Sequence, residues 1–156
     1  MHPTAARFAE AAADRYGLDV DVHEFPEGTK TATDAARAIG CDVAQIASGL
    51  VFAADGEPVV VVTSGANRVE ESRVADEIGA STVRMADPDE VKDATGWSIG
   101  GVPPICHDAD VPVLVDETLL LHDTVWAAAG TPDAVWPVSP DRLVELAGAT
   151  VADVAA

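Results

Sequence analysis

The chain has 156 residues, 48% of them hydrophobic, a length and composition that fit one folded domain with its own core. Its formal net charge is −18, from 27 acidic and 9 basic residues, so it lacks the basic excess typical of proteins that hold nucleic acid by surface charge. The two cysteines, Cys41 and Cys106, form neither a disulfide framework nor a metal-ligand motif, which fits a reducing cytoplasm.

Apolar spacing and the residues that end each run predict the elements in chain order. Asp55-Gly56 between two β-rich apolar runs is a strong hairpin signal. Strands and helices alternate without a linker or repeat, which predicts a single α/β (α+β) domain over residues 1–156 with a mixed sheet. The predicted helices cover about 4–16, 33–39, 69–78, a segment that opens at 87–90, and 140–147; the predicted strands cover about 20–25, 46–54, 57–63, a short one near 83, 111–115, 124–128 and 134–138.

Residues 95–107 break this pattern. The glycine pair Gly100-Gly101 is followed by the proline pair Pro103-Pro104, which is incompatible with regular secondary structure. Glycines let the backbone approach a ligand and point N–H groups at it, and prolines stiffen the turn that holds them. On residue types alone, the loop is either a structural turn or a site that binds an anion or stabilises an oxyanion.

The acidic residues are scattered along the chain, Asp outnumbers Glu, and there are only two lysines, Lys30 and Lys92. This pattern indicates a solvated acidic surface over an ordinary core, which repels itself in dilute salt and is tolerated where salt screens it. We interpret the chain as a protein of a salt-rich cytoplasm. The alternative is an acidic, soluble protein without halophilic adaptation.

The glycine–proline loop resembles that of the YbaK and prolyl-tRNA editing domain family, whose signature Gly-x-x-x-Pro is matched by Gly100 and Pro104. The resemblance implies a curved, barrel-like mixed sheet with helices packed around it. It also implies hydrolysis of the ester between a wrong amino acid and the tRNA 3′ end. Because the four histidines are widely spread, we expect no metal site, and we expect no cofactor. Further segments fit the family in order and with compatible spacing: 31–40, 45–52, 67–79, 85–87, 113–117 and 125–130.

The resemblance also implies a site. The backbone N–H groups of Gly100, Gly101 and Val102 are expected to stabilise the oxyanion. Ser48 stands where the family usually has a lysine. It is the one side chain expected to take part in catalysis beside these backbone groups. The edited amino acid is expected to be small, such as Cys or Ala on tRNA(Pro). The remaining residues expected to contact substrate are Phe25, Trp97, Pro104, Cys106, His107 and Asp116.

Three departures from the family leave alternatives open. Ser48 offers a hydroxyl in place of a charge, so the domain is an active deacylase, a non-catalytic binding module, or a hydrolase of a non-tRNA acyl ester. Phe25 replaces a frequent tyrosine, and Cys106 replaces a glycine. Cys106 beside His107 is either an activated nucleophile or a small apolar group that fills the loop. Asp116 either orients substrate or caps the next turn.

The expected partners are the mischarged tRNA 3′ end and an aminoacyl-tRNA synthetase that delivers it. A net charge of −18 opposes phosphates, so contacts confined to the 3′ end are expected. We expect no DNA partner. We also expect no membrane partner, because no apolar run has the length of a membrane span and the N-terminus lacks a signal-peptide pattern.

Overall fold

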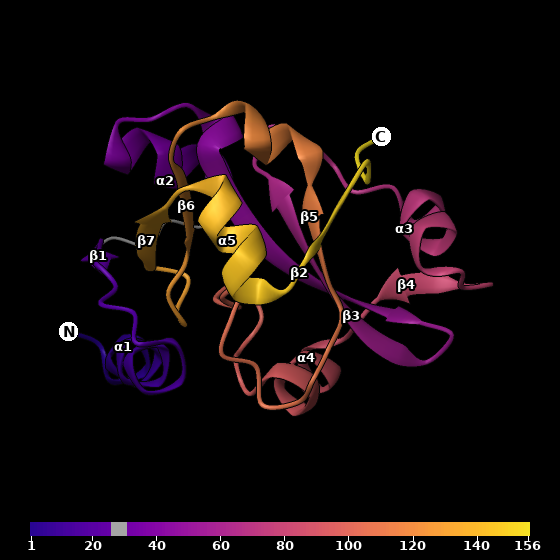
Figure 1. The fold of residues 1–156 in the computed structure, drawn as a ribbon, viewed down its shortest axis with the longest axis horizontal. Coiled ribbons are helices and arrows are strands. Elements are labelled where there is room, and N and C mark those ends of the chain that lie inside the picture. The colour runs from indigo at the N-terminus through magenta and orange to yellow at the C-terminus, as the bar shows by residue number, and fades with distance from the viewer. Residues whose placement is uncertain (26–30) are drawn as a thin grey trace.

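The computed structural model describes residues 1–25 and 31–156 and shows one mixed eight-stranded sheet with helices packed around it (Figure 1). The strand order is β1-β7-β6-β2-β3-β5-β8, with β4 paired to β2. Within the described residues this path ends at β1 and β8, so the sheet is open. The mixed α/β fold predicted from the sequence is confirmed. The helices are α1 (Pro3–Tyr16), α2 (Ala32–Ile39), α3 (Glu71–Ile78), α4 (Pro88–Thr95) and α5 (Pro140–Ala147), with short 3₁₀ turns η1 (Val43–Gln45) and η2 (Glu117–Leu121).

The centre of the sheet is the antiparallel hairpin of β2 (Ile46–Ala54) and β3 (Glu57–Ser64). Asp55 and Gly56 join the strands with φ values of 50° and 84°, the left-handed pair that a tight hairpin needs. The predicted hairpin is therefore confirmed. Residues 59–62 of β3 are almost fully buried, because alternate valines pack into two different core clusters on the two faces.

The other strands extend the hairpin on both sides. β6 (Val125–Ala128) runs parallel to β2, and β7 (Ala134–Val138) and β1 (His23–Glu24) follow it. On the other side β5 (Val113–Asp116) and β8 (Thr150–Ala152) run parallel to β3 and to each other. β4 (Val83–Met85) pairs with the second half of β2.

Two strands differ from the prediction. The strand expected over 20–25 shortens to β1, because only His23 and Glu24 pair with β7 while Val20 and Val22 pack against the core. Strand β8 was not predicted. Its three residues after the αL glycine Gly148 are too few to show a period of two.

Helices α4 and α5 begin at their predicted cap residues. Asp87 and Glu90 form the capping box of α4, and Ser139 caps α5. Helix α1 lies beside β1 at one end of the molecule and buries Ala5, Phe8 and Ala12 (Figure 1). None of the helices in the described ranges combines the length and apolarity of a membrane span.

Candidate functional site

A cavity of about 250 Å³ opens where the N-terminal part of β2 meets the loop after α4 and the turn between β6 and β7. Both predicted catalytic segments reach it: Ser48 from the strand, and Gly100 and Val102 from the loop. The remaining lining is mostly small and apolar and comes mainly from α2, β2, β4, α4, β6 and β7. It comprises Thr31, Ala32, Ala35, Ile46, Ala47, Gly49, Leu50, Val51, Met85, Ala86, Val91, Ile99, Trp126, Ala128, Thr131, Pro132, Ala134 and Val135.

Gly49 allows the loop to lie directly on the strand beside Ser48. A Cβ atom at Gly49 would fall 2.4 Å from the carbonyl oxygen of Val102, far inside van der Waals contact. Any side chain there would therefore push Val102 away from β2. The missing side chain of Gly49 brings the two predicted catalytic segments together.

Gly101 makes a second close approach, on the opposite wall. A Cβ atom there would lie 2.7 Å from Cα of Thr131 and 2.8 Å from the carbonyl oxygen of Gly130. Its N–H donates to the carbonyl of Ser98 at 3.1 Å and closes a turn. Of the three N–H groups expected to act on the oxyanion, that of Gly101 is thus already engaged. Those of Gly100 and Val102 meet no acceptor within residues 1–25 and 31–156.

The polar groups of the cavity are hydroxyls. Ser48 lines the cavity and lies opposite Thr63 in the register of β2 and β3. Thr31 caps α2 by accepting from the N–H of Asp34 at 3.1 Å, and Thr131 accepts from the N–H of Asp133 at 3.2 Å. None of the described lining residues carries a charge. Catalysis here would therefore rest on backbone N–H groups and hydroxyls.

The second half of the loop faces away from this cavity. Pro104, Cys106 and His107 line a separate cavity of about 350 Å³. Trp97 is buried, and its Nε1–H donates to the carbonyl of Cys106 at 2.9 Å. The structure therefore does not bring these four predicted substrate contacts together with Ser48.

Cys106 and His107 do not form a reactive pair. Burial raises the pKa of the Cys106 thiol to about 11, although the nearby Arg15 opposes this, so the thiol is protonated at neutral pH. The Nε2–H of His107 donates to the carbonyl of Pro103 at 2.7 Å. Cys106 has a φ of 68°, a left-handed conformation that glycine adopts without strain. These contacts support a packing role for the thiol.

Phe25 lies near the first cavity without lining it. It is half-buried and lines a cavity of about 570 Å³. Thr131 and Pro132 are common to this cavity and the one at Ser48. Thr131 and Pro132 therefore separate the cavity at Phe25 from the cavity at Ser48.

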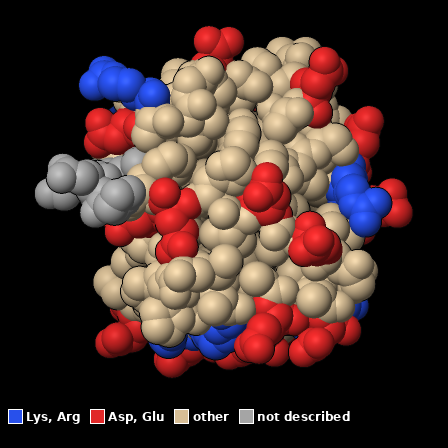
Figure 2. Space-filling model, turned by 90° about the vertical axis from the view of Figure 1, so that its left-hand side faces the viewer, with Lys and Arg blue, Asp and Glu red and all other residues tan. Residues whose placement is uncertain are grey.

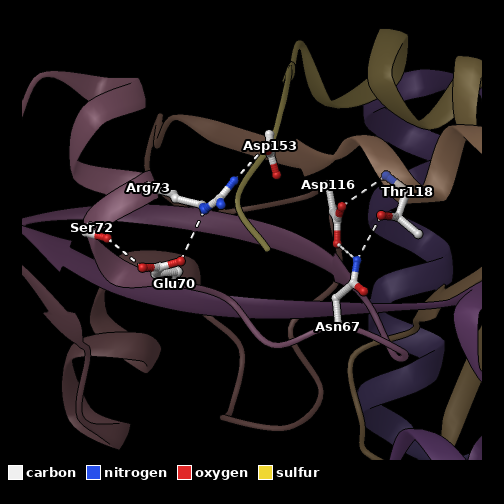
Figure 3. Close-up of polar contacts among 7 residues, drawn as sticks. All are labelled: Asn67, Glu70, Ser72, Arg73, Asp116, Thr118 and Asp153. Atoms are coloured by element: carbon white, nitrogen blue, oxygen red, sulfur yellow. Dashed lines mark hydrogen bonds and ion pairs between the residues drawn. The ribbon is translucent and has the colours of Figure 1, made fainter. Parts of the chain in front are cut away.

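Asp116 sits elsewhere, at the end of β5, and is fully buried (Figure 3). Its Oδ2 accepts from the Asn67 side chain at 2.9 Å and from the Thr63 hydroxyl and the Ser64 N–H at 3.1 Å each. Its Oδ1 accepts from the Thr118 N–H at 3.0 Å. Burial raises the pKa of the carboxyl, but these four hydrogen bonds outweigh it and hold the pKa below its ordinary value. The geometry is that of the cap at the start of η2 and not of a group in the cavity.

The acidic surface carries few basic groups. Figure 2 shows one face on which carboxylates are scattered among uncharged residues and the basic side chains lie at the margins. Some arginines are neutralised locally: Arg73 pairs with Glu70 and Asp153, and Arg84 forms two hydrogen bonds to Glu90. The bond from Arg84 lowers the pKa of Glu90 to about 2. The part of the chain that the structure describes gathers no group of three metal-binding side chains.

Gly49, Thr31 and Thr131 lie at the cavity but were not predicted as site residues. Gly49 had a usable signal, because an isolated glycine inside an apolar strand often marks a close backbone approach. Thr31 also had one, as the N-cap of α2. Thr131 had none, because its place beside the loop depends on how β6 and β7 return to β2.

Comparisons with known proteins show the family of this chain. Residues 26–146 match the model of the aminoacyl-tRNA editing domain. The uncharacterized protein YwhH of Bacillus subtilis (strain 168) is 30% identical over 131 residues, which are 84% of this chain and 83% of that protein. The proline–tRNA ligase of Citrifermentans bemidjiense is 33% identical over 107 residues, 68% of this chain. That match spans only 19% of the ligase.

A solved structure is similar over the whole length. The crystal structure of a candidate trans-editing enzyme for prolyl tRNA synthetase has a TM-score of 0.94 and 39% identity. The match covers 100% of this chain and 99% of that one. Together these matches confirm the family resemblance predicted from the sequence.

Proposed function

The chain belongs to the aminoacyl-tRNA editing domain family, and on this premise we propose that it is a trans-acting deacylase of mischarged tRNA. Its proposed substrate is the ester of a small amino acid, such as Cys or Ala, on tRNA(Pro). The ligase match supports tRNA(Pro), because the shared segment occurs in an enzyme that charges this tRNA.

The observation that carries the proposal is the cavity that joins Ser48 to the glycine–proline loop. Pockets for drug-sized ligands have roughly 300–1,000 Å³. A cavity of about 250 Å³ with mostly apolar walls therefore fits a small aminoacyl group better than a long or charged side chain. An aminoacyl ester is already activated, so an enzyme mainly needs to position it and stabilise its oxyanion.

The proposed mechanism uses the backbone. The N–H groups of Gly100 and Val102 donate to the oxyanion that forms when water, or the thiol of a cysteinyl substrate, attacks the ester carbonyl carbon. The bond to the ribose oxygen then breaks, and that oxygen takes the proton that the attacking water or thiol loses. Ser48 orients the substrate with its hydroxyl, where other members of the family would use a lysine.

The acidic surface favours delivery of the tRNA by a synthetase in the cytoplasm. A protein of net charge −18 repels phosphates in dilute salt, and the described arginines Arg73 and Arg84 are already paired with carboxylates. We infer weak free-standing affinity for tRNA and a working environment rich in salt, where the repulsion is screened.

The test is a deacylation assay in molar KCl with Ala-tRNA(Pro), Cys-tRNA(Pro) and Ser-tRNA(Ala), with correctly charged tRNAs as controls. Selective hydrolysis of one mischarged species supports the proposal and identifies the substrate. Hydrolysis at the spontaneous rate, by protein shown to be folded, contradicts it.

The uncharged lining of the cavity favours a second candidate, a binding module that has lost its catalytic group. The variant Ser48→Lys separates the two functions. If the wild type is inactive and Ser48→Lys gains deacylation, the domain is a decayed enzyme. If the wild type is active, Ser48 suffices. Hydrolysis of a small acyl ester without a tRNA, which the acidic surface favours, is measured in the same assay with a free aminoacyl ester.

A further inference from the structure

We propose that α1 positions the glycine–proline loop through two arginines, Arg7 and Arg15, which we call the arginine clamp. The clamp holds the two ends of the loop and thereby sets where the N–H groups of Gly100 and Val102 lie. This inference rests on the proposed function and assigns positioning residues to it.

The contacts of the clamp are with backbone carbonyls at opposite ends of the loop. Arg7 donates from Nη2 to the carbonyl of Gly96 at 2.8 Å, and its guanidinium lies over the Trp97 ring, 3.9 Å from the centroid. Arg15 donates from Nη1 to the carbonyl of His107 at 3.0 Å. The two arginines are separated by about 12 Å along the helix axis, at 1.5 Å per residue. One rigid helix therefore spans the loop from end to end.

The loop is built to transmit this constraint. Trp97 donates to the carbonyl of Cys106 at 2.9 Å, and the N–H of Asp108 donates to the carbonyl of Thr95 at 3.0 Å, so the two ends are tied together. His107 holds the carbonyl of Pro103. Because burial lowers the pKa of His107, its ring is neutral at pH 7 and keeps this contact as a neutral donor. A shift at either end therefore moves the whole loop.

The choice of partners also points to positioning. In a chain with 27 acidic residues, an arginine finds a carboxylate easily, as Arg73 and Arg84 do. Arg7 and Arg15 instead donate to carbonyls of the loop, and Lys92 adds a bond of 3.2 Å to the same Gly96 carbonyl. Hydrogen bonds from a charged donor are about twice as strong as neutral ones.

The clamp is separable from the docking of α1. Ala5, Phe8 and Ala12 bury the helix in the core, and the Phe8 ring lies 5.7 Å from that of Trp136. Helix α1 precedes residues 26–146, the range that matches the editing-domain model. Removing the guanidinium groups should therefore leave α1 docked and change only the position of the loop.

The experiment compares Arg7→Met, Arg15→Met and the double variant with Arg142→Met. Methionine keeps much of the apolar stem and removes the donors. Arg142 on α5 is a matched control, since its side chain makes no hydrogen bond or ion pair within the described ranges. The Trp97 indole N–H and the amides of residues 100–102 are followed by ¹H–¹⁵N NMR. Deacylation is measured as kcat and KM.

We expect the clamp variants to shift the Trp97 indole and loop resonances and to lower kcat about tenfold singly and about 100-fold together, with KM little changed, because small misplacements cost up to about 100-fold. Arg15→Lys, which keeps one donor, recovers most of the loss. Unchanged loop resonances, or a loss of kcat no larger than that of Arg142→Met, overturns the inference. If the wild type does not deacylate, the proposed function fails, while the NMR comparison still decides on the clamp.

Discussion

The cavity at Ser48 and the network at Asp116 lie in one sheet and are built in opposite ways. The cavity contains no charged group among its described residues, and its walls lie close together because Gly49 and Gly101 lack side chains. The Asp116 network centres on a fully buried carboxylate with four hydrogen bonds (Figure 3). The resemblance implied substrate contact for both. The difference teaches that the buried charge of Asp116 has its acceptor sites filled locally, whereas the proposed site leaves the N–H groups of Gly100 and Val102 without acceptors among the described residues.

The largest effect is expected where the two walls of the cavity meet. Gly49→Ala places a Cβ atom against the carbonyl oxygen of Val102 and should displace the loop, lowering kcat for deacylation about 100-fold. Gly79→Ala is the control, because nothing lies within 4 Å of its Cβ position and its φ of 72° costs stability alone. Equal kcat values for Gly49→Ala and the wild type would show that the contact does not set the site.

The second-largest effect is expected on the stability of the Asp116 network. Asp116→Asn should lower the free energy of unfolding by about 2–3 kcal/mol, because hydrogen bonds to a buried charge are lost, and leave kcat per folded molecule unchanged. Asp153→Asn breaks only the exposed pair with Arg73 and should cost less than about 1 kcal/mol. Chemical denaturation of both variants measures the difference. A selective loss of kcat in Asp116→Asn would move Asp116 into the site.

The contribution of Asp116 to the free energy of unfolding depends on pH. Because the folded pKa of Asp116 is below its ordinary value of 3.8, its contribution to stability is present above about pH 4 and is lost as pH falls through the folded pKa. Asp116→Asn has no such carboxyl. The difference in unfolding free energy between the wild type and the variant should therefore shrink as the pH falls from 5 to 3.

A smaller effect is expected at Ser48. Ser48→Ala removes the hydroxyl but adds no bulk to the wall, so kcat/KM should fall about tenfold, the equivalent of one hydrogen bond of about 1.4 kcal/mol. The free energy of unfolding should stay within about 0.5 kcal/mol of the wild-type value. An unchanged kcat/KM would assign catalysis to the backbone N–H groups alone.

The smallest effect is expected at Cys106, on the far side of the loop. Cys106→Ala should keep at least about half of the activity, since the thiol is protonated and packs away from the cavity at Ser48. Cys106→Gly should do the same and also remove the strain of a φ of 68°. Steady-state kinetics of both variants decide the point. Complete loss of activity in both variants would indicate that the Cys106 thiol acts as a nucleophile.

Most of the fold could be predicted because its signals are local. The Asp55-Gly56 turn, the capping box of α4 and the αL glycines at the ends of the helices each depend on a few neighbouring residues. Strand β8 could not, because its pairing with β5 depends on a distant partner.

The site was predicted only in part. Ser48 and the loop were named from residue types and from the family resemblance, and they do meet. The two faces of the loop were not separable, because Val102 and Pro104 are two residues apart in sequence but line different cavities. Nor did the sequence show that Asp116 has partners on β3, since Thr63 and Ser64 reach it only through the parallel pairing of β3 and β5.

The pairing of β2 with β6 has a consequence for how the protein folds. Ile46 and Trp126 are partners in this pair. The wall that they form can therefore assemble only after the long chain segment between them has folded back. The β2–β3 hairpin, by contrast, needs only its own turn. Because distant pairings form late, the hairpin should form early and the cavity at the end of folding. A nascent chain would therefore carry Ser48 well before the cavity around it is closed.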